Sequence, residues 1–205
     1  MISKYVLVGE FHGTKECSKA FLELAMVHKV KDIALEVDRS YQKELDSYLK
    51  GKRHKLSFLA HKGPHDGRTT PALKKLIDAA NKLDIRVHLV DGPAFSGPEA
   101  RDEQMAKSLM KIKNRVAFLC GNVHASKIKF KGQRTCGTFL PRHQTVSYNI
   151  IPLNGGRFYN FRIGRYERNE KLYKKYKRAK LPMIIKSDTA AYDYLYLINR
   201  FTPSK

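Results

Sequence analysis

The stretch from Lys4 to Gly13, KYVLVGEFHG, decides the fold that the sequence predicts. Its centre, Val6 to Val8, is an unbroken apolar run of the kind found in strands that are covered on both faces. The run stops at Gly9, and the polar side chains that follow are an acid, Glu10, and an imidazole, His12. We therefore expect a buried strand whose end carries groups that can do chemistry.

Three further apolar runs end in the same way. They cover 32–35, 85–90 and 116–119, and they lead to Glu36, Asp91 and His124 respectively. Apolar residues at helical spacing separate these runs, and alternation of strand and helix is the signature of a parallel sheet. Because the strands of an open parallel sheet end at one rim, where ligands bind, the sequence predicts that Glu10, His12, Glu36, Asp91 and His124 meet in one site.

The predicted fold is a mainly parallel central sheet with helices on both faces, followed by an antiparallel extension toward the C-terminus. After Phe130 the pattern changes to short strands, a basic helical run and an aromatic end. The expected strands cover 138–140, 145–152 and 157–163, with a hairpin turn at 154–156, and the basic helix covers 166–180. We expect a single α/β domain over 1–205, with a core over 1–152 and a basic extension, 153–205, packed on it.

A Gly- and Pro-rich loop, 92–99, follows the strand that ends at Asp91. Loops in this place often cover active sites. Arg101 and Asp102 then open a helix expected from about 98 to 111, so the Arg101 guanidinium can reach back over the strand ends. Asp91 and Arg101 also suit a simple ion pair that holds this loop.

The chain is strongly basic, with 40 Lys and Arg residues against 19 acidic ones and a formal charge of +21. Such a field attracts phosphates, anionic membranes and acidic partners, and it carries no information about the fold. The segments 165–180 and 52–68 are expected to supply most of the basic surface. Because no nucleic-acid reading motif accompanies this charge, any nucleic-acid contact is expected to be weak and non-specific.

Cysteine usage and hydropathy bear on location. Three cysteines without a CxxC pair fit a reducing compartment better than a disulfide framework. The N-terminal apolar run is too short for a secretory signal, and no run approaches the roughly 20 apolar residues of a membrane span. The sequence favours a cytoplasmic protein with no membrane span.

An ordered set of short motifs resembles the erythromycin esterase/ChaN-like superfamily, which includes the TraB and TIKI proteins. The set is GEFHG at 9–13, ALE at 34–36, RD at 101–102 with MA at 105–106, and GNVHA at 121–125. The resemblance covers about residues 5 to 152. It implies an α/β fold in which two histidines and a glutamate face each other in a cleft. It implies no single activity, because members include a metal-free macrolide esterase, metal-dependent proteases, a haem-binding lipoprotein and toxin domains.

Three functions of different classes remain open. The first is a hydrolase of esters, lactones or peptides, acting on a small-molecule or peptide substrate. The second is a non-catalytic binder of haem or another small ligand, and the third is a binder of nucleic acid or another anionic surface. The chain lacks the lipoprotein signal and the membrane anchor of the haem-binding and protease members, which argues against those two roles in their known form.

The hydrolase hypothesis assigns catalytic roles to Glu10, His12, Glu36, Arg101 and His124. His12 or Glu36 deprotonates a water, while His124 and Arg101 stabilise the developing oxyanion. In a variant of this hypothesis His12, Glu36 and His124 hold a divalent metal, because two imidazoles and a carboxylate suit an open catalytic site. Asp91 and His143 are the predicted substrate contacts, whereas His88, within a strand, is read as a satisfied structural residue.

Overall fold

The computed structural model describes residues 3–60, 65–92 and 97–204. Parts of two predicted segments lie outside the described residues. These are 61–64, in the basic insert 52–68, and 93–96, in the loop 92–99.

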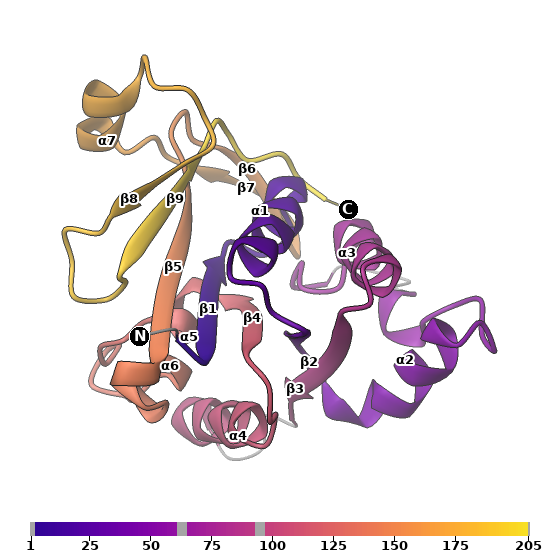
Figure 1. The fold of residues 1–205 in the computed structure, drawn as a ribbon. Coiled ribbons are helices and arrows are strands. Elements are labelled where there is room, and N and C mark those ends of the chain that lie inside the picture. The colour runs from indigo at the N-terminus through magenta and orange to yellow at the C-terminus, as the bar shows by residue number, and fades with distance from the viewer. Residues whose placement is uncertain (1–2, 61–64, 93–96, 205) are drawn as a thin grey trace.

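The described residues form one seven-stranded sheet and a separate two-stranded hairpin (Figure 1). The strand order in the sheet is β3-β2-β4-β1-β5-β9-β8, and all neighbours are parallel except β8 and β9. The sheet strands are β1 Tyr5–Glu10, β2 Asp32–Asp38, β3 Arg86–Asp91, β4 Val116–Gly121, β5 Thr145–Pro152, β8 Met183–Lys186 and β9 Tyr194–Ile198, and the hairpin is β6 Gly156–Asn160 with β7 Arg162–Tyr166. This confirms the predicted fold class.

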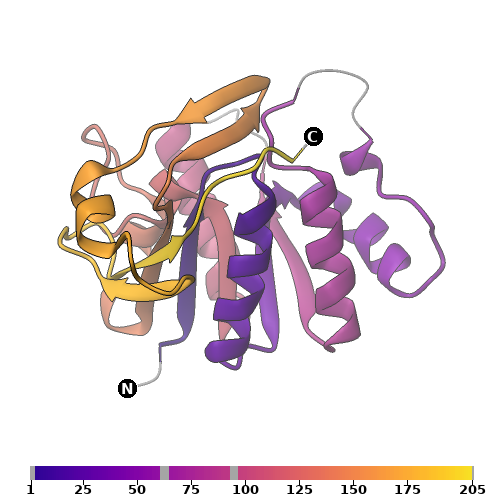
Figure 2. The same cartoon turned by 90° about the horizontal axis from the view of Figure 1, so that it is seen from above.

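Helices cover both faces of the sheet (Figures 1 and 2). The α-helices α1, α2 and α3 lie on one face, and α4 and α6 lie on the other. Their bounds are α1 Lys15–Val27, α2 Gln42–Leu49, α3 Pro71–Lys82, α4 Pro98–Met110, α5 Asn122–Ala125, α6 Cys136–Phe139 and α7 Glu170–Tyr176. Short 3-10 helices cover Arg39–Tyr41, Ser57–Leu59 and Arg142–Gln144.

Two apolar layers sandwich the sheet, as the unbroken runs in the sequence predict. In β1, Val6 and Val8 point to the layer that contains α1 and α3, while Tyr5 and Leu7 point to the layer that contains α4. Every residue of β1 is buried. Because side chains alternate between faces along a strand, a strand buried on both faces needs apolar residues at every position.

The carboxyl ends of the first four strands share one rim. Glu10 at the end of β1 pairs with Gly121 at the end of β4. In β2 the register with β3 shifts after Leu35 and resumes at Asp38, which lies opposite Asp91. Glu36 lies within this irregular stretch, at the centre of the rim.

The sequence prediction was wrong in detail after Phe130. Residues 138–140 are not a strand: a capping box between Thr135 and Thr138 starts the short helix α6 there. The strand 145–152 is not antiparallel, because α5 and α6 return the chain to the amino end of the sheet and β5 then runs parallel to β1. The antiparallel pairing belongs instead to β8 and β9.

The C-terminal part departs from the prediction in two further places. The expected strand 157–163 is a complete hairpin, since the chain reverses at Phe161 and β7 pairs back on β6. The basic helix is limited to α7, which the Asn169 side chain caps at Leu172 N. No residue of α7 is buried, and its partly buried Leu172 and Tyr176 pack on only a small apolar cluster around β9, which gives little support for a longer helix. The aromatic end forms β9 and joins the main sheet.

Among the residues that the structure describes, no helix has both the length and the apolar character needed to cross a membrane.

Candidate functional site

Glu36 lies at the centre of the carboxyl rim and is almost fully buried, with a side chain 3% exposed. Its Oε2 accepts a hydrogen bond from the Gly121 backbone N–H at 2.7 Å, and its Oε1 accepts one from Arg101 Nη2 at 2.6 Å. Burial by itself would raise the pKa of this carboxyl, but the charges of His12, His124, Arg101 and Arg68 outweigh it and lower the pKa to about 2. Glu36 is therefore a fixed anion and a poor proton acceptor.

His12 is oriented by the acid two residues before it. Its Nδ1 lies 3.0 Å from Glu10 Oε1, and its Nε2 lies 3.7 Å from Glu36 Oε2. Burial lowers the pKa of His12, but the Glu36 and Glu10 carboxylates more than offset this, so the pKa is raised above the ordinary 6.5. When Nδ1–H donates to Glu10, the Nε2 lone pair of His12 points into the site.

His124 forms a second pair of the same kind from another part of the chain. Its Nδ1 lies 2.8 Å from Asp102 Oδ1 and its Nε2 lies 3.4 Å from Glu36 Oε1. The Asp102 oxygen also accepts from the Cys136 backbone N–H at 2.7 Å, which fixes its position. Burial lowers the pKa of His124, yet Asp102 and Glu36 raise it on balance. Two carboxylate–imidazole pairs thus present their Nε2 atoms to one carboxylate.

Two arginines connect Glu36 to Asp91. Arg101 donates from Nε to Asp91 Oδ1 at 2.8 Å and from Nη2 to Asp91 Oδ2 at 2.5 Å, in addition to its bond with Glu36. Arg68 Nη1 lies 3.3 Å from Glu36 and 3.2 Å from Asp91, and its guanidinium also pairs with Asp66. Burial lowers the pKa of Arg101, but Asp91 and Glu36 raise it on balance, so the group stays charged.

Gly121 permits this convergence because it has no side chain. A Cβ at this position would lie 3.0 Å from His12 Nε2, 3.4 Å from His124 Cδ2 and 3.6 Å from Glu36 Oε2. The backbone there has φ −53° and ψ 143°, which any residue can adopt. The glycine is therefore required for space at the centre of the site and not for its conformation.

The hairpin β6–β7 packs on the two loops that carry His12 and Arg68. Tyr159 N donates to Gly13 O at 3.1 Å, and Phe161 N donates to His65 O at 2.6 Å. Gly13 has φ +73°, and a Cβ there would lie 1.8 Å from Tyr159 O, so only glycine fits. The hairpin thus holds the two loops beside each other.

The structure brings together six of the seven residues that the sequence predicted for the site, and it excludes one. Those together are Glu10, His12, Glu36, Asp91, Arg101 and His124. His143 is the exception, and its placement in the site was wrong. It lies just before β5, whose first residue, Thr145, pairs with Tyr5 at the amino end of β1. This places His143 at the opposite rim of the sheet, where it is exposed.

Sequence reasoning missed two members of the site. Arg68 follows a loop in the basic insert, and nothing in its local pattern separates it from the other cations there. Asp102 was available as half of the RD pair, and its position three residues before the buried Met105 places it on the inward face of α4. It orients His124, a role that only the contact shows.

The donor atoms of this site are poorly arranged to coordinate a metal ion. Among the described residues, no group of three His, Cys, Asp or Glu side chains is placed so as to hold a metal ion. The two Glu36 oxygens, which the metal hypothesis needs, accept from Arg101 and from the Gly121 N–H. Two guanidinium groups at the same carboxylate supply the positive charge that a cation would bring.

The cysteines are poor candidates for a nucleophile. Cys17, Cys120 and Cys136 are all free and buried. Burial raises the pKa of each thiol well above its ordinary value, which disfavours the reactive thiolate.

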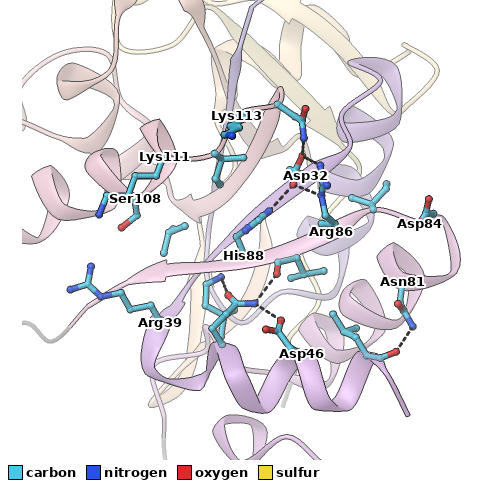
Figure 3. A pocket seen from close by; sticks show the side chains of 18 residues that line it. Asp32, Arg39, Asp46, Asn81, Asp84, Arg86, His88, Ser108, Lys111 and Lys113 are labelled. Carbon is cyan, nitrogen blue, oxygen red and sulfur yellow. Dashed lines mark hydrogen bonds and ion pairs between the residues drawn. The ribbon is translucent and has the colours of Figure 1, made fainter. Parts of the chain in front are cut away.

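A third acid–histidine pair lies away from this site and lines a cavity of about 750 Å³ along the edge strand β3 (Figure 3). His88 Nε2 lies 2.7 Å from Asp32 Oδ1, and Arg86 donates to both Asp32 oxygens at 2.8 Å. Asp32 begins β2, so the pair belongs to the amino rim. Its carboxylate is fully bonded, in agreement with the interpretation of His88 as a satisfied structural residue.

Comparison with known proteins gives structural likenesses only. No family model matches the chain, and no curated protein matches it significantly. A variant of the erythromycin esterase EreC in its open conformation superposes with a TM-score of 0.74 and 10% identity, and the match covers 99% of this chain and 92% of the esterase chain. A succinoglycan biosynthesis protein superposes with a TM-score of 0.67 and 13% identity, and the match covers 98% of this chain and 89% of that protein. ChaN of Campylobacter jejuni, in a structure of cofacial haem binding, superposes with a TM-score of 0.55 and 13% identity, and the match covers 95% of this chain and 87% of the ChaN chain.

The chain therefore has the erythromycin esterase/ChaN-like fold, as the motif resemblance predicted. At these identities the likeness shows the fold alone. One of the similar proteins is an esterase and another binds haem, so activity has to be argued from the site of this chain.

Proposed function

We propose that this protein is a hydrolase that activates water with an acid–histidine pair. The observation that carries the proposal is the convergence of two such pairs, Glu10–His12 and Asp102–His124, on one buried carboxylate. Each pair has the geometry in which a carboxylate orients an imidazole and stabilises its protonated form. The site is lined by charged groups and is partly accessible, since the side chains of His12 and His124 are 19% and 16% exposed. A polar, accessible site favours catalysis over the burial of an apolar ligand.

His12 is the general base in this mechanism. Its Nε2 takes a proton from water as the water oxygen attacks the substrate carbonyl carbon, and the carbonyl electrons move onto its oxygen. Arg101 Nη1 and His124 Nε2 lie 3.4 Å apart. With His124 in its protonated form, in which Nδ1–H donates to Asp102, one substrate oxygen can accept hydrogen bonds from Arg101 Nη1 and from His124 Nε2 while negative charge develops. When the tetrahedral intermediate collapses, His12 returns the proton to the leaving group.

Glu36 has a supporting role. Its low pKa removes it as a base, but its charge raises the pKa of both histidines and holds Arg101 in place. This revises the sequence hypothesis, which allowed either His12 or Glu36 to deprotonate water. Asp91, predicted to contact substrate, is bonded to both arginines and acts here as their anchor.

The test is a panel of esters, lactones and peptides assayed with and without added divalent metal. We expect turnover of at least one class, unchanged after treatment with a chelator. Turnover that requires added metal would replace the proposal with the metal variant. Absence of turnover across the panel, together with tight binding of haem or another ligand at His12 and His124, would contradict the proposal of an enzyme. It would support the same site as a binding site.

The pH profile of the hydrolysis gives a more specific prediction. His12 must be neutral to act as a base, and its pKa is raised, so kcat/KM should fall as pH drops below a midpoint above 6.5. In Glu10→Gln the hydrogen-bonded charge is lost, which lowers the pKa of His12 and moves the midpoint to lower pH. The maximal rate should decrease less than in His12→Ala. An unmoved midpoint would contradict the assignment of His12 as the base.

A second variant tests the geometry at the centre of the site. In Gly121→Ala the added methyl group reaches His12 Nε2 at 3.0 Å, so the imidazole has to shift. We expect kcat to fall by about tenfold or more, since small misplacements of catalytic groups are costly. The free energy of unfolding should change by less than about 1 kcal/mol, because the backbone conformation suits alanine. A fall in kcat that is accompanied by an equally large loss of folded structure in circular dichroism would show a general packing effect.

A further inference from the structure

A cavity of about 560 Å³ lies at the base of the hairpin β6–β7, and four arginines line it. Three segments supply its wall: the turn into β6 with the start of that strand, the end of β7 with the chain that follows it, and Arg200, two residues after β9. The charged lining residues are Arg157, Arg165, Arg168 and Arg200, with Glu167 and Glu170 as the acids. The lining therefore carries an excess of two positive charges.

Backbone hydrogen bonds hold these segments together. Phe201 N donates to Gly155 O at 3.0 Å, and Arg157 N donates to Phe201 O at 3.0 Å. Asn154 N donates to Asn199 O at 2.8 Å. Because Arg157 and Arg200 extend from two chains that are bonded to each other on both sides, the spacing of their backbones is fixed.

The four arginines fall into two kinds. Arg165 pairs with Glu167 at 3.3 Å, and Arg168 pairs with Glu170 at 2.7 Å while its guanidinium lies 4.0 Å from the centre of the Tyr173 ring. Within the described part of the chain, the guanidinium groups of Arg157 and Arg200 have no hydrogen-bond or ion-pair partner. The guanidinium groups of Arg157 and Arg200 can therefore donate hydrogen bonds to a ligand in the cavity, whereas those of Arg165 and Arg168 are already held by ion pairs.

We propose that this arginine cavity binds a small phosphorylated molecule, and that Arg157 and Arg200 donate hydrogen bonds to its phosphoryl oxygens. Guanidinium groups suit phosphate because their paired N–H donors match two oxygens at once. The volume lies in the range of small-molecule sites, roughly 300–1,000 Å³. The site shares no lining residue with the catalytic rim, although Tyr166 lines the cavity and its ring packs against Phe11 at 4.6 Å.

The experiment is calorimetric titration of the full chain with inorganic pyrophosphate at physiological ionic strength. Each charge-assisted hydrogen bond is worth about tenfold in affinity or more. The double variant Arg157→Gln/Arg200→Gln should therefore bind pyrophosphate about 100-fold more weakly than the wild type. Both residues are exposed, and neither guanidinium has a hydrogen-bond or ion-pair partner among the described residues, so thermal unfolding should be unchanged.

The matched control removes the same charge elsewhere. Arg39 and Arg142 are also exposed and unpaired within the described residues, and Arg39 lines the larger cavity of Figure 3. Arg39→Gln/Arg142→Gln should bind pyrophosphate within about twofold of the wild type. Equal weakening in both double variants would show attraction by net charge alone and would overturn the proposal.

Two further titrations test whether the phosphoryl group belongs to a small molecule, a nucleic acid or a lipid. A short single-stranded oligonucleotide and phosphatidylcholine vesicles that contain phosphatidic acid are titrated in the same buffer. Weaker binding of both than of pyrophosphate supports a small ligand. Tighter binding of either one, lost in Arg157→Gln/Arg200→Gln, would replace the proposal with a nucleic-acid or lipid surface. None of these measurements depends on hydrolysis, so they are independent of the proposed function.

Discussion

Replacing His12 or His124 with alanine should lower kcat/KM by about 10²–10⁴ for whichever ester, lactone or peptide the wild type hydrolyses. The reason is that each imidazole contributes its Nε2 to the same reacting centre around Glu36. The two effects should not add, because when residues act as one unit at one reacting centre, most of the activity is lost when the first of them is removed. The double variant is expected to be little worse than either single one.

His88→Ala is the matched control for this experiment. His88 also bonds a buried aspartate, at 2.7 Å, but it lies at the amino rim of the sheet. Its removal should leave kcat/KM within about twofold of the wild type. Steady-state kinetics and circular dichroism on the wild type and the four variants make the comparison. Fully additive losses in the double variant would show that the two histidines act separately, and the shared mechanism would then be wrong.

Glu36→Gln should lower the free energy of unfolding by about 3–5 kcal/mol, the loss typical of breaking a buried ion pair. Glu36 balances Arg101 and Arg68 and accepts the Gly121 N–H, so a neutral amide leaves two partly buried guanidinium groups with less compensation.

Urea unfolding at several pH values measures this effect. Because the pKa of Glu36 is about 2 in the folded chain against an ordinary 4.5, its contribution is fully present above about pH 4.5 and is lost as pH falls toward 2. Glu36→Gln should therefore lie closest to the wild type at the acid end of this range. The control is Glu103→Gln, whose exposed pair with Lys107 is worth less than about 1 kcal/mol. Similar losses in both variants would contradict the central role of Glu36.

The sequence predicted the rim of the site well. Short apolar runs that end in Glu10, Glu36 and Asp91 and alternate with helical patterns favour parallel strands buried on both faces, and parallel strands end on the same side. That argument needs the local pattern and the direction of the chain, both of which a sequence displays. It was less reliable after Phe130, where 138–140 forms a helix, because short segments adopt whichever structure their neighbours stabilise.

Tertiary structure alone decided which groups act together. Glu10 and His12 are neighbours in the chain, but the pairing of Asp102 with His124 and the approach of Arg68 to Glu36 join residues 22 and 32 positions apart. The sequence fixes which side chains are available at the rim, since strand patterning is local. Partners across the rim depend on loop paths and on the space left at Gly121, and these follow from the packing of the whole chain.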